Sequence, residues 1–127
     1  MEILVDTHTL IWWLEKNIRL SKRALALLAS PTTNVLVSAA VGWELAIKAN
    51  AGKFHSLTLI NEFARLIDRE GFAALPISLD HAIHAGLLPL HHRDPFDRIL
   101  IAQAQLLNVS ILSADAVLDR YGVRRVW

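Results

Sequence analysis

The chain has 127 residues, which suits one hydrophobic core, and we expect a single domain over residues 1–127. Because cysteine is absent, disulfide bonds, thiolate zinc sites and a cysteine nucleophile are excluded. The formal net charge of +1 favours no class of partner. Charged residues and histidines interrupt every apolar stretch before it reaches the roughly 20 residues of a membrane span, and the N-terminus lacks a signal-peptide pattern. We therefore expect a cytoplasmic protein without a membrane segment.

Short apolar strands alternate with amphipathic helices along the chain. In chain order, we predict a strand over 2–5, helices over about 8–16 and 22–28, a strand over 34–38, helices over 41–51 and 59–70, a strand over 72–77, helices over 79–88 and 96–107, a strand over 108–112, a helix over 115–121 and a strand over 123–127. Ser21 and Ser78 are predicted helix N-caps, and Pro76 favours an edge or end position for its strand. This alternation predicts an α/β fold with a mostly parallel central sheet of four to five strands and helices on both faces.

Four acidic residues stand where the predicted strands end or on the first turns of the following helices: Asp6, Glu44, Asp97 and Asp115. Ligands of parallel sheets bind at the carboxyl ends of the strands, where the strand order reverses. If the first strand and the strand over 108–112 are neighbours, all four acids converge on one edge of the sheet.

Such a cluster requires a counter-charge, because two carboxylates about 5 Å apart repel each other by roughly 3 kcal/mol at an effective dielectric constant near 20. Oxygen ligands without cysteine favour Mg²⁺ or Mn²⁺. A water molecule activated by such an ion attacks phosphodiesters, while the ion neutralises charge that develops on the phosphate.

Each acid also has a structural interpretation. Asp6 and Asp115 are suitable helix N-caps, and Asp97 suits the positive end of a helix dipole. Glu44 lies within an apolar run, where a surface glutamate is less expected. The occurrence of all four acids at such positions favours a functional site.

The segment around Asp97 contains a competing acid, Asp94. Because Asp94 precedes Pro95, we assign it to the loop or the helix cap, and we assign the ligand role to Asp97. Arg98 either contacts a scissile phosphate or pairs with an acid of the cluster. Lys48, one turn beyond Glu44, either steers nucleic acid or forms a helix ion pair.

Two further pairs of residues attract attention. His91 and His92 resemble metal ligands by residue type, but a polar loop favours solvent-facing positions for both. Trp12 and Trp13 cannot both face inward from one helix, so we expect one of them at an interface with a partner protein.

Four segments together resemble PIN-domain nucleases, and within them the VapC-type toxins of bacterial toxin-antitoxin modules. These segments are Ile3-Leu4-Val5-Asp6-Thr7-His8, Val37 to Leu45, His92-Arg93-Asp94-Pro95-Phe96-Asp97-Arg98 with Ile101 to Ala104, and Ile111-Leu112-Ser113-Ala114-Asp115. The resemblance covers nearly the whole chain and implies a PIN-like three-layer sandwich.

By position, the resemblance implies metal-binding acids at Asp6, Glu44 and Asp97, with Asp115 as the more variable fourth. Ser113, and less directly Thr7, would be hydroxyl residues beside the site. The fourth motif usually has threonine before the acid, whereas Ser113-Ala114 precedes Asp115 here. The resemblance further implies an RNA substrate cut internally, a homodimer and a cognate antitoxin that covers the site.

Two other functions fit the sequence less well. An inert PIN-like module that binds RNA or protein is disfavoured by the presence of all the expected acids. A phosphotransfer domain that uses Asp6 is disfavoured because Thr7 and His8 follow it where a second acid is expected, and because no glycine-rich phosphate loop is present.

Overall fold

The computed structural model describes residues 1–53 and 57–127. In chain order its strands and helices are β1 (Glu2–Val5), α1 (Thr7–Glu15), α2 (Lys22–Ala29), β2 (Asn34–Ser38), α3 (Ala39–Asn50), α4 (Leu57–Asn61), α5 (Phe63–Arg69), β3 (Ala73–Leu75), α6 (Leu79–Leu87), α7 (Pro95–Leu107), β4 (Ser110–Leu112), the 3₁₀ helix η1 (Ala116–Tyr121) and β5 (Arg125–Val126).

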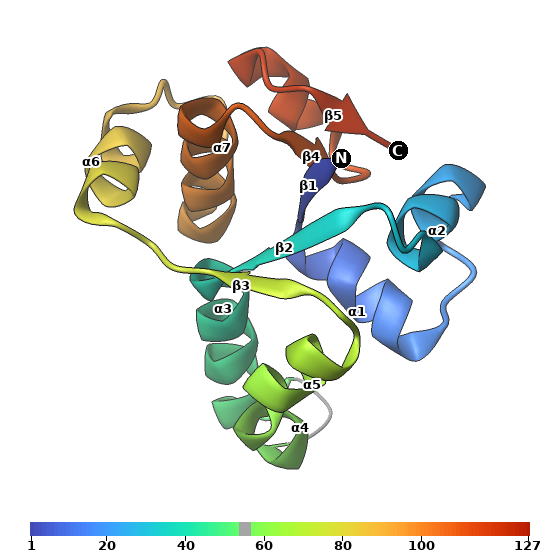
Figure 1. Ribbon diagram of the computed structural model, residues 1–127. Helices are drawn as coiled ribbons and strands as arrows, with labels where there is room; N and C mark the ends of the chain where they lie inside the picture. The colour runs from blue at the N-terminus through green and yellow to red at the C-terminus, as the bar shows by residue number, and fades with distance from the viewer. Residues whose placement is uncertain (54–56) are drawn as a thin grey trace.

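The described strands form one five-stranded sheet in the order β3-β2-β1-β4-β5, and every neighbouring pair is parallel. Leu4 of β1 pairs with Leu36 of β2 on one side and with Ile111 of β4 on the other. Figure 1 shows β1 in the middle of the sheet and helices around it. The prediction of an α/β fold with a parallel sheet of four to five strands is confirmed, and β1 and β4 are indeed neighbours.

The central strand is apolar because both of its faces are covered. Ile3, Leu4 and Val5 are fully buried, and so are Ile111 and Leu112 of the neighbouring β4. A parallel strand between two helical layers has no solvent face, so its sequence is a continuous apolar run rather than an alternating one. The first polar side chain after each such run is therefore placed at the edge of the sheet.

The strand order changes direction between β1 and β4. From β1 the chain moves outward through β2 to β3, and from β4 it moves the other way to β5. The carboxyl ends of β1 and β4 therefore flank the switch point, the usual ligand position in open parallel sheets. Asp6 directly follows β1, and Ser113 directly follows β4.

The prediction of one helix over 59–70 is wrong. Two helices, α4 and α5, replace it, because Glu62 leaves the helical region with φ −99° and ψ 8°. The first packs against α3 and the second against β3, so the chain must change direction between them. An apolar stripe in the sequence does not show that its two halves face different neighbours.

Other differences concern element ends. Strands β3, β4 and β5 are shorter than predicted, α3 begins at Ala39 rather than Val41, and the helix after Asp115 is a 3₁₀ helix. The predicted N-caps are confirmed, since Ser21 accepts a hydrogen bond from the Ala24 N–H and Ser78 from the His81 N–H. Among the described residues, no helix is both long enough and apolar enough to cross a membrane.

Candidate functional site

Asp6 both caps a helix and faces the switch point. It follows β1 directly, its side-chain Oδ1 accepts a hydrogen bond of 2.9 Å from the Thr9 N–H, and its backbone N–H donates to Leu112 O of β4. Only 8% of the residue is exposed. The cap uses Oδ1, and within the described part of the chain no hydrogen bond to Oδ2 is found. The structural and functional interpretations of Asp6 are therefore compatible.

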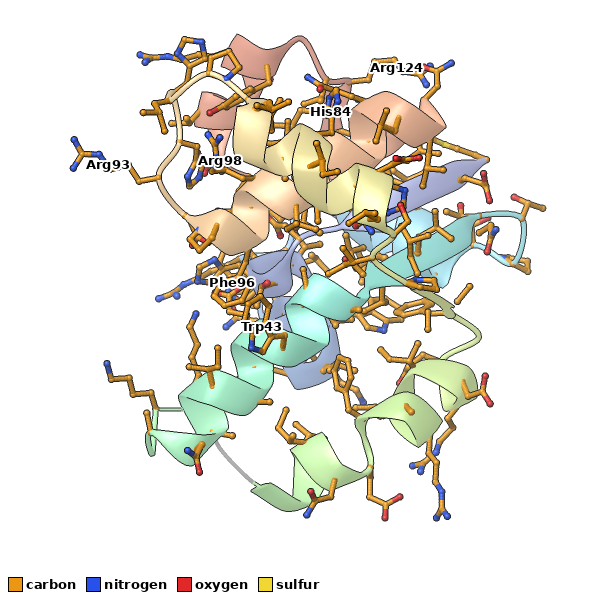
Figure 2. The ribbon with its side chains drawn as sticks, turned by 90° about the vertical axis from the view of Figure 1, so that its left-hand side faces the viewer. Trp43, His84, Arg93, Phe96, Arg98 and Arg124 are labelled. Atoms are coloured by element: carbon orange, nitrogen blue, oxygen red, sulfur yellow. The ribbon has the colours of Figure 1, made fainter. Side chains whose placement is uncertain are left out.

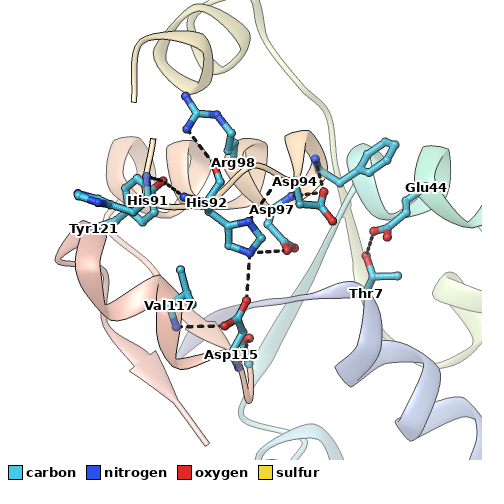
Figure 3. Close-up of polar contacts among 12 residues, drawn as sticks. Thr7, Glu44, His91, His92, Asp94, Asp97, Arg98, Asp115, Val117 and Tyr121 are labelled. Carbon is cyan, nitrogen blue, oxygen red and sulfur yellow. Dashed lines mark hydrogen bonds and ion pairs between the residues drawn. The ribbon is translucent and has the colours of Figure 1, made fainter. Parts of the chain in front are cut away.

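Glu44 reaches the same edge from α3. It is 6% exposed, its Oε1 accepts a hydrogen bond from Thr7 Oγ1, and its Oε2 forms an ion pair of 2.8 Å with Lys48 Nζ. Thr7 is the residue after Asp6, so this hydrogen bond joins Glu44 to the end of β1, as Figure 3 shows. The helix ion pair between Lys48 and Glu44 is confirmed.

Asp97 lies in the first turn of α7, where Asp94 is the N-cap and Pro95 the first residue. Asp94 Oδ1 accepts hydrogen bonds from the Phe96 and Asp97 N–H groups, at 2.9 and 3.3 Å. The prediction that Asp94 caps this helix is confirmed. Asp97 therefore lies at the positive end of the helix dipole, and its Oδ2 contacts His92.

Asp115 and Ser113 belong to the loop after β4. Asp115 is the N-cap of η1, where Oδ1 accepts a hydrogen bond of 3.0 Å from the Val117 N–H. Ser113 is fully buried, and its Oγ accepts a hydrogen bond from the Asp115 N–H. Ser113 therefore orients the loop that carries Asp115.

A histidine joins Asp97 to Asp115. His92 Nε2 lies 3.0 Å from Asp97 Oδ2 and 3.0 Å from Asp115 Oδ2 (Figure 3). The prediction that His92 faces solvent is wrong, since only 16% of its side chain is exposed. The sequence indicates that the predicted acidic cluster needs a hydrogen-bond donor nearby. It does not indicate which histidine supplies it, because the conformation of the loop decides that His92 faces the acids and His91 is exposed.

The carboxylates act on one another electrostatically. Burial is the largest cause that raises the pKa of Asp97 from 3.8 to about 7. The charges of Asp94, Asp6 and Glu44 contribute to this rise, and His92 opposes it. The side chains from β1, α3 and α7 are thus close enough for their charges to interact. The charges of Asp6 and Glu44 thus reach Asp97, and His92 joins Asp97 to Asp115.

Arg98 does not have the predicted environment. It is 9% exposed, and its guanidinium donates hydrogen bonds to four backbone carbonyls rather than to a carboxylate. The acceptors are the carbonyl oxygens of Ala85, Leu88, Pro89 and His92, at 2.8–3.3 Å. Figure 2 shows Arg98 between α6 and α7, whereas Arg93 points away from the protein. Arg98 holds the end of α6 and the following loop in place. Within the described residues no ion pair joins it to an acid, and its contact with a scissile phosphate stays a prediction.

The donor set fits a hard divalent cation. The charges of buried Asp6 and Glu44 help to raise the pKa of Asp97, and within the described residues no hydrogen bond is found to Asp97 Oδ1 or Asp6 Oδ2. Ligand-type atoms of His92, Asp97 and Asp115 lie within 4.8 Å of one another, so one ion can reach both Asp97 and Asp115. Carboxylate oxygens are the ligands that Mg²⁺ and Mn²⁺ prefer.

Aromatic residues lie beside the acids. Trp43 precedes Glu44 and Phe96 precedes Asp97, and their rings pack edge to face with centroids 5.0 Å apart (Figure 2). Trp12 packs against Trp127, whereas Trp13 packs against Phe72. Both tryptophans of α1 are half-buried within the chain, so the expectation that one of them lies at an interface stays a prediction.

The PIN domain family model matches residues 3–124. A comparison with curated protein sequences found no match.

Solved structures share the fold. VapBC2 from Rickettsia felis, bound to a DNA fragment from its promoter, is similar with a TM-score of 0.72 at 15% identity, over 99% of this chain and 98% of that one. VapBC-1 from nontypeable Haemophilus influenzae gives a TM-score of 0.66 at 20% identity, over 99% and 97%. A toxin-antitoxin complex from Klebsiella pneumoniae gives 0.61 at 24% identity, over 89% and 86%.

The role of Arg98 predicts a loss of stability upon its replacement. In Arg98→Gln, the buried carbonyls at the end of α6 lose their donors, and we expect the free energy of unfolding to fall by roughly 2–4 kcal/mol. The matched control Arg93→Gln changes an exposed arginine of the same segment and should change stability by less than about 0.5 kcal/mol. Urea denaturation followed by circular dichroism measures both. Equal stability of the two variants would contradict the carbonyl contacts.

The raised pKa of Asp97 predicts a pH-dependent stability difference. The folded protein, with a pKa of about 7 at Asp97, binds this proton more tightly than the unfolded chain, with a pKa of 3.8. Asp97 therefore destabilises the fold progressively as the pH rises from about 4 to about 7.

The Asp97→Asn variant removes this effect. We define the stability difference as the free energy of unfolding of the variant minus that of the parent. In the presence of a chelator, this difference should increase by on the order of 2–4 kcal/mol from about pH 4 to pH 8. The exposed Asp80 of α6 gives the control variant Asp80→Asn, for which we expect a constant difference. A constant difference for Asp97→Asn as well would show that its carboxyl is not perturbed.

Proposed function

This chain belongs to the PIN-domain family, and we propose that it is a divalent-metal-dependent endoribonuclease that acts as the toxin of a toxin-antitoxin pair. The observation that carries the proposal is the group of acids at the switch point: Asp97 and Asp115 lie within reach of one ion, and the charges of Asp6 and Glu44 act on Asp97. Buried like charges are unfavourable without a cation, so their presence at the switch point supports a metal-dependent hydrolase.

Asp6, Glu44 and Asp97 would hold the cation, with Asp115 as a fourth acid. A bound Mg²⁺ or Mn²⁺ supplies a water molecule of lowered pKa and neutralises charge on a scissile phosphate. Thr7 and Lys48 each bind one oxygen of Glu44 and thereby fix the direction of its carboxylate. Ser113 orients the backbone of Asp115. These contacts keep the acids in place before a ligand arrives, which reduces the reorganisation that cleavage requires.

The similar structures support the toxin role. They include VapBC-1, VapBC2 and a toxin-antitoxin complex. We propose for this chain a cognate antitoxin, a homodimeric state and a cytoplasmic location. The chain covers nearly the whole length of these structures, so residues 1–127 would form a single nuclease domain.

The cleavage proposal predicts metal-dependent activity that requires Asp6. Purified protein should cleave structured RNA in Mg²⁺ or Mn²⁺, and a chelator should abolish cleavage. Asp6→Asn keeps a good helix N-cap but removes one ligand charge, so we expect activity to fall about 100-fold or more without loss of fold.

Asp80→Asn, at an exposed acid of α6, should cleave like the parent and controls for a general effect of charge. Thermal unfolding would verify that each variant is folded. Equal cleavage by the parent and Asp6→Asn would place the activity elsewhere or in a contaminant.

The toxin proposal predicts growth arrest that depends on the same carboxylates. Expression of the parent in a bacterial host should arrest growth, whereas Asp6→Asn and Asp97→Asn should permit it at equal protein levels, as measured by culture density and immunoblot. Co-expression of a small neighbouring gene product should relieve the arrest. Continued arrest by both variants would instead indicate an inert module that sequesters RNA or protein.

A further inference from the structure

His92 contacts one carboxylate oxygen of each of two candidate metal ligands, Asp97 and Asp115. Its Nε2 is 3.0 Å from both Asp97 Oδ2 and Asp115 Oδ2. On the opposite side of the ring, Nδ1 accepts a hydrogen bond of 3.2 Å from the Asp94 N–H. A ring nitrogen that accepts a hydrogen bond carries no hydrogen, so the hydrogen of the neutral imidazole is on Nε2 and points at the two carboxylates.

The segment that carries His92 is held from two sides. Tyr121 Oη accepts hydrogen bonds from the His91 and His92 N–H groups, at 3.0 and 2.7 Å, and donates one of 2.7 Å to Pro89 O. Arg98 donates to the carbonyl oxygens of Pro89 and His92. The ring is thus a fixed part of the site rather than a side chain on a free loop.

The hydrogen on Nε2 and a divalent cation compete for the same two oxygens. Nε2 is 3.0 Å from both Oδ2 atoms, so its single hydrogen is shared between them. Mg²⁺ binds carboxylate oxygens directly, at about 2.1 Å. A cation that binds both Oδ2 atoms would repel the positive end of the N–H dipole that points at them, so the bridge opposes its binding. The imidazole cannot itself become a ligand through Nε2 while Nδ1 accepts from Asp94, because its hydrogen has no other position.

We propose that His92 is a latch on the metal site: its Nε2–H bridges Asp97 and Asp115 in the absence of metal and competes with a divalent cation for their Oδ2 atoms. This inference rests on the proposed function, since it assumes that a cation binds at these carboxylates. The latch holds the two carboxylates together without metal and lowers the apparent affinity for the ion, because the bridging hydrogen bond opposes binding of the ion to the same oxygens.

Two substitutions by neutral residues distinguish the role of the Nε2 donor from that of the rest of the imidazole ring. His92→Asn retains an acceptor near Nδ1 for the Asp94 N–H but lacks a donor at the Nε2 position. His92→Gln has an amide that can donate near the Nε2 position. Neither changes the charge of the site, so a difference between them reports on the bridging hydrogen bond.

The test is the affinity for Mn²⁺, measured by isothermal titration calorimetry on the metal-free protein without RNA. We expect His92→Asn to bind Mn²⁺ about tenfold more tightly than the parent, because a hydrogen bond to a charged acceptor no longer opposes binding. His92→Gln should remain within about threefold of the parent. Unchanged or weaker binding by His92→Asn would overturn the latch and make His92 a support of the ion instead.

Asp6→Asn distinguishes a failure of the latch from a failure of the metal site. If it binds Mn²⁺ as tightly as the parent, the proposed metal site itself is wrong, whatever the His92 variants do. If it binds weakly and His92→Asn does not bind tightly, only the latch is wrong.

A measurement on the parent protein tests the proposal even if the variants misfold. With ¹⁵N-labelled histidine, NMR should show His92 as the Nε2–H tautomer without metal, and Mg²⁺ should shift its ring signals. Comparison with the spectrum of His92→Gln assigns them. Ring signals of His92 that do not change at saturating Mg²⁺ would overturn the proposal.

Discussion

The repulsion among carboxylates at the switch point is the interaction on which this structure depends. Asp6, Glu44 and Asp97 come from β1, α3 and α7, and burial together with the neighbouring charges raises the pKa of Asp97 to about 7. The protein offsets this repulsion locally, since each acid receives at least one donor: the Thr9 N–H for Asp6, Thr7 and Lys48 for Glu44, and His92 for Asp97. These donors reduce the excess negative charge without removing it, which leaves the cluster suited to a cation.

Helix ends provide the second part of that compensation. Asp6 and Asp115 are N-caps, and Asp97 lies in the first turn of α7, where unpaired N–H groups favour negative charge. Glu44 does not lie at such an end, and it is the acid that has a lysine partner. Each of the four acids thus has a local reason to be stable as an anion, which explains how a fold tolerates them together.

The parts of the fold and site that follow local rules could be predicted from the sequence. Buried runs such as Ile3 to Val5, the serine caps and the cap at Asp94 depend on near neighbours, and parallel strands bring their carboxyl ends together. The contacts of His92 and Arg98 could not be predicted from the sequence, because each depends on how the segment between α6 and α7 folds back. Arg98 follows a candidate ligand in the sequence, yet its long side chain reaches backbone carbonyls instead of the cluster. The break between α4 and α5 at Glu62 could not be predicted for a similar reason, because it depends on which elements the two helices pack against.

The buried guanidinium of Arg98 also has a mechanical consequence. One side chain from α7 binds carbonyl oxygens at the end of α6 and in the His92 segment, so these three parts of the chain cannot move independently without breaking charge-assisted hydrogen bonds. Arg98 therefore couples the position of α6, whose Leu79 and Leu87 are exposed, to the backbone of His92, which Tyr121 also holds.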